Sequence, residues 1–209
     1  MLKLSGDIKI NIRHSLTFEI QRVISVAKRA EWYEKMKYRL SLPKGIALAE
    51  IKNFSTNQIK KAVAKEYKEE NYEKAKLHIQ KEWNGNCAGL KEKIIKNGLQ
   101  PHDAYIIFLT KYGVGGSYEL PNKIIINFKT IEIADMPRVI IHEIIHLAIE
   151  PLIQKHETRH WEKERIVDLL FNRIDRTLSR MQNITINTQK IDTSFGKFFP
   201  DIEKILQNS

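Results

Sequence analysis

The sequence predicts an α+β fold, on three observations. The first hundred residues have mostly a helical pattern, two compact apolar runs of strand length follow residue 101, and a long apolar helix comes next. The chain has 209 residues, of which 42% are hydrophobic and 29% charged, an ordinary composition for a protein with a buried core. We therefore expect a small sheet beside that helix, preceded by a helical region.

The first hundred residues are expected to hold one strand and several helices. Residues 7–12 alternate polar and apolar side chains, as a short strand does. The hydroxyls of Ser15 and Thr17 can then cap an amphipathic helix that runs to about residue 40, before Pro43 and Gly45. Residues 56–96 again have a helical pattern, with interruptions expected near Asn71 and at residues 84–86.

After residue 101 the pattern changes to strands and two helices. Residues 104–109 and 123–128 are apolar runs of strand length, joined by the glycine-rich segment 112–118, which predicts a hairpin-like connection. A helix is expected over residues 136–149, with Pro137 near its start and Pro151 at its end. Trp161 begins another amphipathic helix.

The length of the chain and the change of pattern after residue 101 together predict three segments. They are a basic, mainly helical region at residues 1–100, an α+β domain at residues 101–181 that holds the chemical motifs described below, and a short tail at residues 182–209. The length lies above the commonest single-domain size, so a main domain with an appendage is as reasonable as one continuous body.

The charge of the chain is uneven. The formal net charge is +10, and residues 1–100 contain 21 Lys or Arg against 11 Asp or Glu, whereas residues 101–209 contain 14 of each. A basic half suggests an acidic partner or nucleic acid, although lysine-rich helices are usually only solvated faces. No zinc finger, aromatic RNA-binding signature or arginine-rich tract supports specific nucleic-acid binding.

The single cysteine and the apolar segments bear on the compartment. Cys87 alone can form neither an internal disulfide nor a thiolate cage, so any metal must be held by His, Asp or Glu. No apolar stretch is long enough for membrane insertion, and the first residues show no secretory signal pattern. We expect a cytoplasmic protein; its oligomeric state is not indicated.

One helix carries the main chemical signal, His142-Glu143-Ile144-Ile145-His146. This helix is apolar on every side, and burying two imidazoles and a carboxylate in it is costly unless they are paired or bound to metal. Histidines four apart share a face and can reach one Zn²⁺. In this His-Glu-x-x-His pattern Glu143 takes a proton from water activated by the metal and passes it to the leaving amine. The alternative is two core histidines with ordinary hydrogen bonds.

A third ligand must come from elsewhere, because catalytic zinc usually has three protein ligands. Glu164 and Asp168 are four apart on the helix that begins at Trp161, so they share a face. Glu164 can reach the metal while Asp168 accepts the free N–H of a ligand imidazole. Glu162 is a weaker candidate, because position 166 is Ile and not Asp.

The two histidines, seventeen intervening residues and then Glu164-x-x-x-Asp168 resemble the gluzincin branch of the zinc metallopeptidases, to which thermolysin belongs. The resemblance covers about residues 102–180. It implies a zincin-like core, a small mixed sheet plus the active-site helix, that hydrolyses peptide bonds. The implied zinc ligands are His142, His146 and Glu164, with Glu143 as general base and acid and Asp168 beside His142. A slightly short loop and the lack of a large second helical lobe would make this a minimal member.

The resemblance also implies groups that contact a peptide or protein substrate. Such enzymes pair extended peptide with an edge strand before the active-site helix, and the segment from Gly115 and Gly116 to Tyr118 fits that place. The candidates for stabilising the oxyanion are Tyr118, His156 and His160, none at a diagnostic spacing.

Three alternatives remain open. His156 or His160 could be the third ligand, as in SprT-like proteases that act on proteins attached to DNA; the basic first half suits this reading, but neither histidine has that family's glycine neighbour and Glu164 with Asp168 would be unexplained. The chain could also be a non-catalytic zincin-fold protein or a basic nucleic-acid-binding protein. The tail is expected to pack on the core, although it could instead lie in the cleft as an inhibitory segment.

Overall fold

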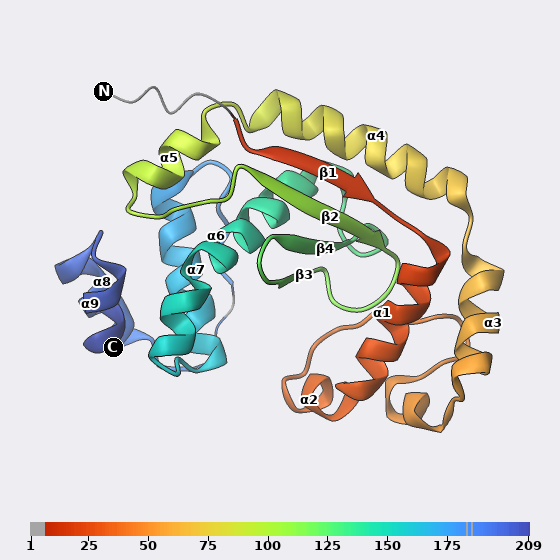
Figure 1. The fold of residues 1–209 in the computed structure, drawn as a ribbon. Coiled ribbons are helices and arrows are strands. Elements are labelled where there is room, and N and C mark those ends of the chain that lie inside the picture. Colours follow the sequence, from red (N-terminus) through yellow and green to blue (C-terminus); the bar gives the residue numbers. More distant parts are fainter. Residues whose placement is uncertain (1–6, 183, 185) are drawn as a thin grey trace.

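The computed structural model describes residues 7–182, 184 and 186–209 and has an α+β architecture (Figure 1). Four strands form one sheet in the order β1-β2-β4-β3. β1 pairs with β2 and β2 with β4 in parallel, whereas β3 and β4 are antiparallel, so β3 lies at one edge. The strands are β1 (Lys9–Arg13), β2 (Ala104–Thr110), β3 (Gly116–Glu119) and β4 (Lys123–Asn127).

The glycine-rich connection differs from the expected hairpin. The segment between β2 and β4 contains a strand of its own, β3, which forms the hairpin with β4 and takes the edge position. β2 and β4 are therefore parallel neighbours, and no hairpin joins them directly. The expectation that residues 115–118 lie at an edge of the sheet agrees with this topology.

The helices of the first half begin at clear capping signals but are shorter than expected. Ser15 caps α1 (Leu16–Lys28), which ends at Arg29, and α2 (Ala30–Lys35) follows in place of one helix to residue 40. Ser55 and Gln58 form a capping box for α3 (Thr56–Glu66). Two further elements are the short 3₁₀ helix η1 (Leu48–Asn53) and α5 (Leu90–Lys96).

The helical segment 56–96 was expected to be interrupted near residue 71 and at residues 84–86, and its interruptions lie a few residues from these positions. α4 (Glu69–Asn86) runs through both positions, because Tyr72, Ile79 and Trp83 bury one of its faces. The chain leaves helical geometry at Tyr67, whose backbone is extended, and at Gly89, which has φ of +69°. Glycine tolerates this left-handed conformation. The helix is therefore interrupted at Gly89, while Gly85 stays within α4.

The two helices that carry the predicted site follow the sheet. After η2 (Ile133–Asp135), α6 (Met136–Lys155) contains Pro137 in its first turn and continues through Pro151, contrary to the expected end at residue 149. Ile149 and Ile153 are buried on either side of Pro151, and their packing outweighs the one lost hydrogen bond. α7 (His160–Ile174) then packs against α6.

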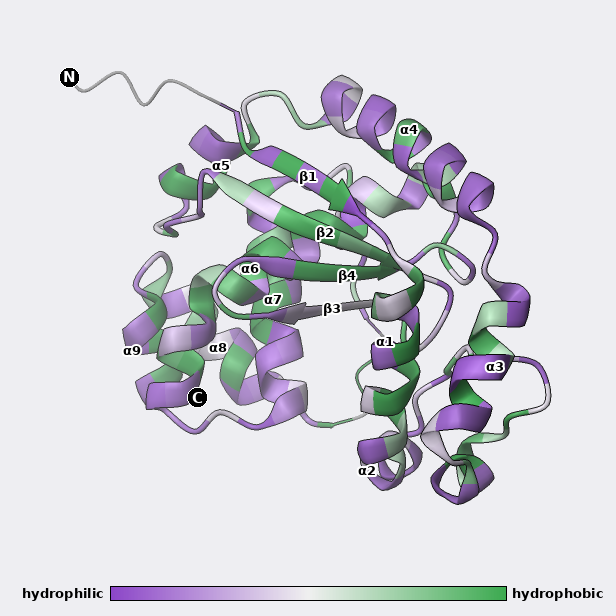
Figure 2. Ribbon diagram, turned by 45° about the vertical axis from the view of Figure 1, so that its right-hand side comes forward, coloured by the Kyte–Doolittle hydropathy of each residue, from purple (hydrophilic) through white to green (hydrophobic). Residues whose placement is uncertain are grey.

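The buried side chains form two hydrophobic clusters. The larger joins the sheet to α4, α5, α6, α7, α8 (Gln189–Phe198) and α9 (Ile202–Gln207); we call this part the main body. The smaller joins α1, α2, η1 and α3, which we call the helical lobe. In Figure 2, β2 and β4 are largely hydrophobic, whereas α4 is mostly hydrophilic. None of the helices in the described residues is both long and apolar enough to span a membrane.

These clusters divide the chain differently from the three predicted segments. β1 pairs with β2 across residue 100, and α4 and α5 contribute to the main body, so only α1 to α3 form a separate cluster. In the tail, Ile191, Phe195 and Ile205 are buried in the core of the main body. The tail helices thus pack on the core, as the sequence predicts, and do not fill the cleft described below.

Candidate metal centre

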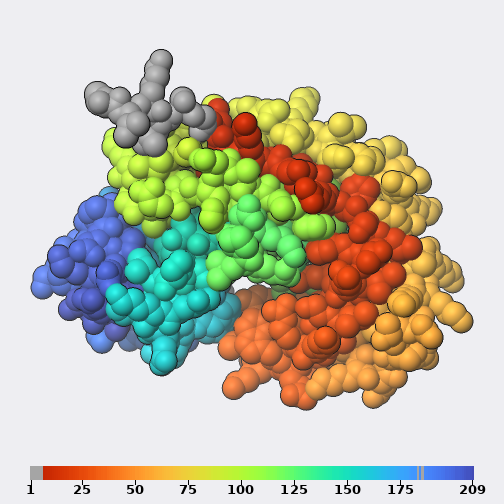
Figure 3. Space-filling model, viewed as in Figure 1, coloured from red at the N-terminus to blue at the C-terminus, as the bar shows by residue number. Residues whose placement is uncertain are grey.

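A cleft of about 720 Å³ separates the helical lobe from the main body. Residues of α2 and the loop after it form one wall, and residues of β3, α6 and α7 form the other. Figure 3 shows this hollow between the orange surface of the helical lobe and the cyan surface of α6 and α7. The predicted histidines and carboxylates lie on the main-body wall.

Three predicted ligand atoms converge in the cleft. Nε2 of His142 lies 3.1 Å from Nε2 of His146, and Oε2 of Glu164 lies 3.4 and 3.3 Å from these two nitrogens. Ligand atoms at bonding distance from a tetrahedral Zn²⁺ are about 3.3 Å apart, given zinc–ligand distances of about 2.0 to 2.2 Å. The spacing of the three atoms therefore fits one such ion.

The protonation of these groups also suits a metal. Burial lowers the pKa of His146 to about 4, so its imidazole is neutral at pH 7 and has a lone pair to offer. Burial alone would raise the pKa of Glu164, but the neighbouring His146 and His142 outweigh it and the pKa is lowered. Glu164 is therefore ionised at neutral pH, as a metal ligand must be.

Asp168 lies behind the ligands, where it was predicted. Its Oδ1 is 4.0 Å from Nδ1 of His142 and is buried without a hydrogen-bond partner. Its Oδ2 accepts a hydrogen bond of 2.7 Å from the backbone N–H of Gln182. A small rotation of the His142 ring would let Nδ1–H donate to Oδ1, the arrangement that orients a metal-binding imidazole.

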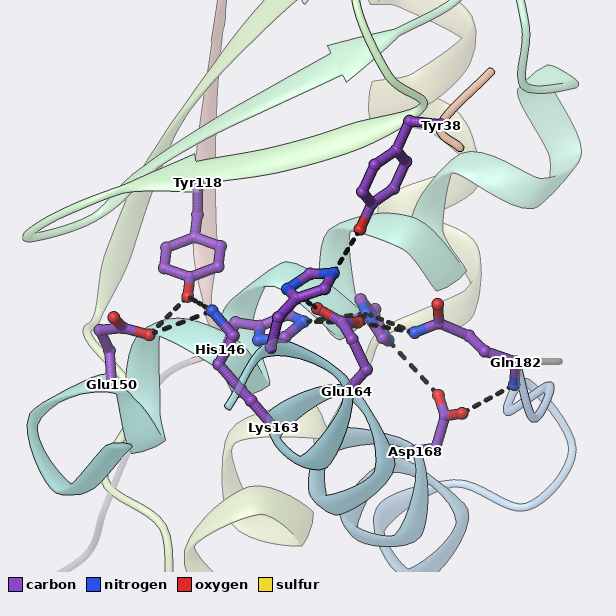
Figure 4. A network of polar contacts seen from close by, with 10 residues as sticks. Tyr38, Tyr118, His146, Glu150, Lys163, Glu164, Asp168 and Gln182 are labelled. Carbon is purple, nitrogen blue, oxygen red and sulfur yellow. Dashed lines mark hydrogen bonds and ion pairs between the residues drawn. The ribbon is translucent and has the colours of Figure 1, made fainter. Parts of the chain in front are cut away.

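Gln182 is a site residue that the sequence did not reveal. Its side-chain Nε2 donates to Oε2 of Glu164 at 2.7 Å, and Figure 4 shows it beside Asp168. It is the first residue of the predicted tail segment and follows α7 by several residues. Nothing in the local pattern marks it, because only the turn after α7 brings it back to the site.

Glu143 lies beside the ligand cluster and against β3. It is buried, and burial raises its pKa to about 7. A Cβ atom at position 116 would collide with Oε1 of Glu143 and lie 2.7 Å from Cγ1 of Val139, so only glycine fits there. Gly115 also lines the cleft, and a Cβ on it would lie 3.1 Å from Ile131. Both predicted glycines are thus at the site, and Gly116 leaves room for Glu143.

Tyr118 packs on the site without pointing its hydroxyl at the ligands. Its ring stacks on His146 at 5.1 Å between centroids, while its hydroxyl donates to Glu150 and accepts from Nζ of Lys163 at 2.9 Å. Glu150 is one turn beyond His146 on α6, and Lys163 is on α7. Figure 4 shows this group to one side of the ligand cluster. Sequence reasoning missed Glu150 and Lys163, which look like ordinary surface charges.

The two further histidines lie apart. Nε2 of His156 is 3.8 Å from Glu203 of α9, so His156 faces the tail and does not line the cleft. His160 does line it, with Nδ1 3.8 Å from Oε1 of Glu164. Glu162 pairs with Arg159 at the start of α7 and lies outside the ligand cluster.

Tyr38 reaches the site from the opposite wall. Its hydroxyl lies 2.7 Å from Nε2 of His160, so this contact crosses the cleft (Figure 4). Burial, together with the charges of Glu164 and Glu143, raises the pKa of Tyr38, which keeps its hydroxyl protonated. Tyr38 lies more than a hundred residues before the ligand motif, and no sequence pattern connects the two.

Comparison of the chain with protein-family models, curated proteins and solved structures found no match. The chemical interpretation therefore depends on the geometry of the cleft and on the resemblance of the motif.

Proposed function

We propose that this protein is a zinc-dependent peptidase of the gluzincin type with a zincin-like core. In this proposal His142, His146 and Glu164 bind the metal, and Glu143 is the general base and acid. The observation that carries it is the spacing of three ligand atoms, 3.1 to 3.4 Å apart, beside a second carboxylate, that of Glu143, which is buried and free of the cluster.

Glu143 would move the proton in peptide hydrolysis. When bound, the zinc ion supplies Lewis acidity, which polarises the scissile carbonyl and acidifies water. Glu143 takes a proton from water as the water oxygen bonds to the carbonyl carbon, and it gives that proton to the nitrogen as the C–N bond breaks. Burial, which raises the pKa of Glu143 to about 7, favours the first of these steps, because it makes the carboxylate a stronger base.

β3 would position the substrate. In the described part of the chain β3 pairs only with β4, so its outer edge can take an extended peptide through backbone hydrogen bonds. Gly116 and Tyr118 on this strand contact Glu143 and His146, so a peptide bound along it would pass over the ligand cluster.

Tyr38 and His160 are the best-placed donors for the developing oxyanion. Of the three residues that the sequence suggested for this role, Tyr118 has its hydroxyl held by Glu150 and Lys163, and His156 faces the tail. His160 and its partner Tyr38 both line the cleft. We infer that they hydrogen bond the substrate carbonyl, a contribution that typically strengthens in the transition state.

The geometry favours Glu164 over a third histidine. Oε2 of Glu164 is close to both Nε2 atoms, whereas Nε2 of His160 is taken by Tyr38. In the SprT-like alternative a ring nitrogen of His160 would have to join the two Nε2 atoms, but His160 lies outside the cluster that they form with Glu164, and Glu164 and Asp168 would have no role. A non-catalytic reading would leave the buried carboxyl of Glu143 unexplained.

Peptidase activity is tested with zinc-loaded wild type and Glu143→Gln on an unfolded protein substrate. We expect cleavage by the wild type, a fall of about 10² to 10⁴ in kcat/KM for the variant, and equal zinc content in both. Glu132→Gln, at an exposed position outside the cleft, is the matched control and should keep full activity. Zinc-loaded wild type that is no more active than Glu143→Gln would refute the proposal.

A further inference from the structure

The charged residues around the cleft bear on which peptides it accepts. Among the described residues, five cationic side chains line it, and the carboxylates that line it are those of Glu143 and Glu164, which belong to the proposed metal centre. The cations are Arg29, Arg39, Arg138, Lys163 and Arg180. Two other hollows in the surface carry a more even charge: one is lined by one Asp and one Lys, the other by Arg22, Lys123 and Glu119.

The kind of cation is more informative than the charge. The chain contains 25 lysines and only ten arginines, yet four of the ten arginines and one of the 25 lysines line the cleft. A lysine-rich composition alone would place mostly lysines there. Guanidinium groups bind carboxylates through two parallel hydrogen bonds, which an ammonium group cannot do.

The arginines stand on both walls. Arg29 and Arg39 belong to the helical lobe, beside the loop that carries Tyr38. Arg138 is one turn before His142 on α6, and Arg180 follows α7. A peptide that lies along β3 over the metal centre would therefore have guanidinium groups within reach of its side chains on either side.

Several of these cations lack a full set of partners among the described residues. Arg138 and Arg180 share one carboxylate, that of Asp135, at 3.7 and 3.3 Å, and Nε of Arg138 is buried without a hydrogen bond. Arg29 donates a hydrogen bond to the Ser25 hydroxyl and lies over the Tyr33 ring, but it pairs with no carboxylate of the described residues, and Arg39 has neither an ion pair nor a side-chain hydrogen bond with them. Like charges around a cleft repel one another, and a ligand of opposite charge relieves this repulsion.

We propose that the cleft selects acidic peptide segments, and that Arg29 and Arg39 are its main specificity-determining residues. This inference rests on the proposed peptidase function, because it takes the bound chain to be a peptide along β3. Carboxylate side chains of the peptide would pair with the arginines of both walls. Nucleic acid is less well suited, since the cations surround a cleft that ends at the sheet edge and do not form an open stripe.

The test measures binding without turnover. Zinc-loaded full-length Glu143→Gln protein is titrated against three fluorescent peptides of equal length, in which alanine alternates with glutamate, glutamine or lysine, and anisotropy is recorded. We expect the glutamate peptide to bind at least about tenfold more tightly than the glutamine peptide, and the lysine peptide most weakly. Adding Arg29→Gln and Arg39→Gln should remove most of this preference and leave the zinc content unchanged.

The matched control removes two charges from the same lobe outside the cleft. Lys60 and Lys61 are exposed on α3, so Lys60→Gln with Lys61→Gln should keep the preference. Arg180→Gln is a milder variant that should give a smaller loss of the same sign and should leave folding intact, because this side chain is 68% exposed.

Three results would overturn the inference. They are equal or undetectable binding of the three peptides, a preference that survives in the double arginine variant, and displacement of the glutamate peptide by a single-stranded oligonucleotide at lower concentrations than by unlabelled glutamate peptide. Failure of the peptidase proposal looks different: wild-type protein would then bind the acidic peptide selectively but cleave none of the three.

Discussion

The two walls of the cleft differ in how their side chains reach it. On the main-body wall, the ligands and Glu143 come from two adjacent helices, α6 and α7, within 23 residues of sequence. On the helical-lobe wall, Tyr38, Arg29 and Arg39 come from a separate hydrophobic cluster about a hundred residues earlier. The candidate metal centre thus comes from one pair of adjacent helices, whereas the proposed substrate contacts depend on how the helical lobe is attached to the main body.

The helical lobe is attached to the main body through buried hydrogen bonds of polar side chains. Glu19 of α1 accepts hydrogen bonds from Tyr72 of α4, from Thr110 of β2 and from the backbone N–H of Lys111 at 2.7 Å. Arg22, also on α1, donates to the Tyr112 carbonyl and the Ser117 hydroxyl beside β3. We therefore expect changes on the main-body wall to affect metal and chemistry, and changes on the lobe wall to affect substrate binding or stability.

Among variants that keep Glu143 and the three proposed ligands, Gly116→Ala gives the largest effect expected on the main-body wall. The new Cβ would overlap Oε1 of Glu143, and the carboxyl must shift. A misplacement of about 1 Å typically costs about 10² in rate, so kcat should fall by that order while the zinc content stays constant. Gly196→Ala, where a Cβ meets nothing within 4 Å, is the control. Unchanged kcat for Gly116→Ala would show that Glu143 does not need its observed position.

Asp168→Asn tests the orientation of His142. An amide in this place accepts the Nδ1–H bond less strongly, and loss of such partners typically lowers metal affinity by about 10- to 100-fold. Competition with a zinc-binding dye measures the change. Glu162→Gln should leave affinity unchanged, because Glu162 pairs with Arg159 at the start of α7, outside the ligand cluster. Equal affinities of Asp168→Asn and wild type would remove Asp168 from the metal centre.

Tyr38→Phe sharpens the contrast between the walls. It removes one hydroxyl from the lobe side and leaves the main-body wall intact, so the zinc content should not change while kcat/KM falls by about tenfold. Tyr112→Phe, at a buried tyrosine of the same hydrophobic cluster that does not line the cleft, is the control for stability. If Tyr38→Phe lost zinc and activity together, the lobe would be part of the metal centre and the comparison would fail.

The smallest expected effect concerns the attachment of the lobe. Burial raises the pKa of Glu19, partly offset by its hydrogen bonds to Thr110 and Tyr72. The folded protein therefore holds this proton to a higher pH than the unfolded chain, and stability falls as the pH rises from the ordinary glutamate pKa through the raised value. Urea denaturation should show this decline in wild type and a weaker one in Glu19→Gln. Parallel pH profiles would contradict it.

The sequence predicted best those features that depend on the spacing of residues within one helix or strand. The spacing of His142, His146, Glu164 and Asp168 predicted which side chains share helix faces, and the structure brings these four together. It predicted the α+β class, and it placed β1, β2 and β4 to within a residue or two, because β1 alternates polar and apolar side chains and the apolar runs of β2 and β4 are compact.

The remaining errors and omissions have tertiary causes. The parallel pairing of β2 with β4 depends on β3 taking the edge, and Pro151 is tolerated because neighbouring isoleucines are buried. Tyr38 and Gln182 reach the site through the docking of the lobe and the return of the chain after α7. No pattern within either segment could reveal these contacts.

The central claim is that α6 and α7 together build one zinc site with Glu164 as the third ligand. The direct measurement is metal content by inductively coupled plasma mass spectrometry on untagged protein, with wild type, Glu164→Ala and His160→Ala prepared side by side. The account predicts about one zinc per chain in wild type and in His160→Ala, and its loss in Glu164→Ala. Retention in Glu164→Ala with loss in His160→Ala, or no zinc in wild type after zinc is added, would contradict it.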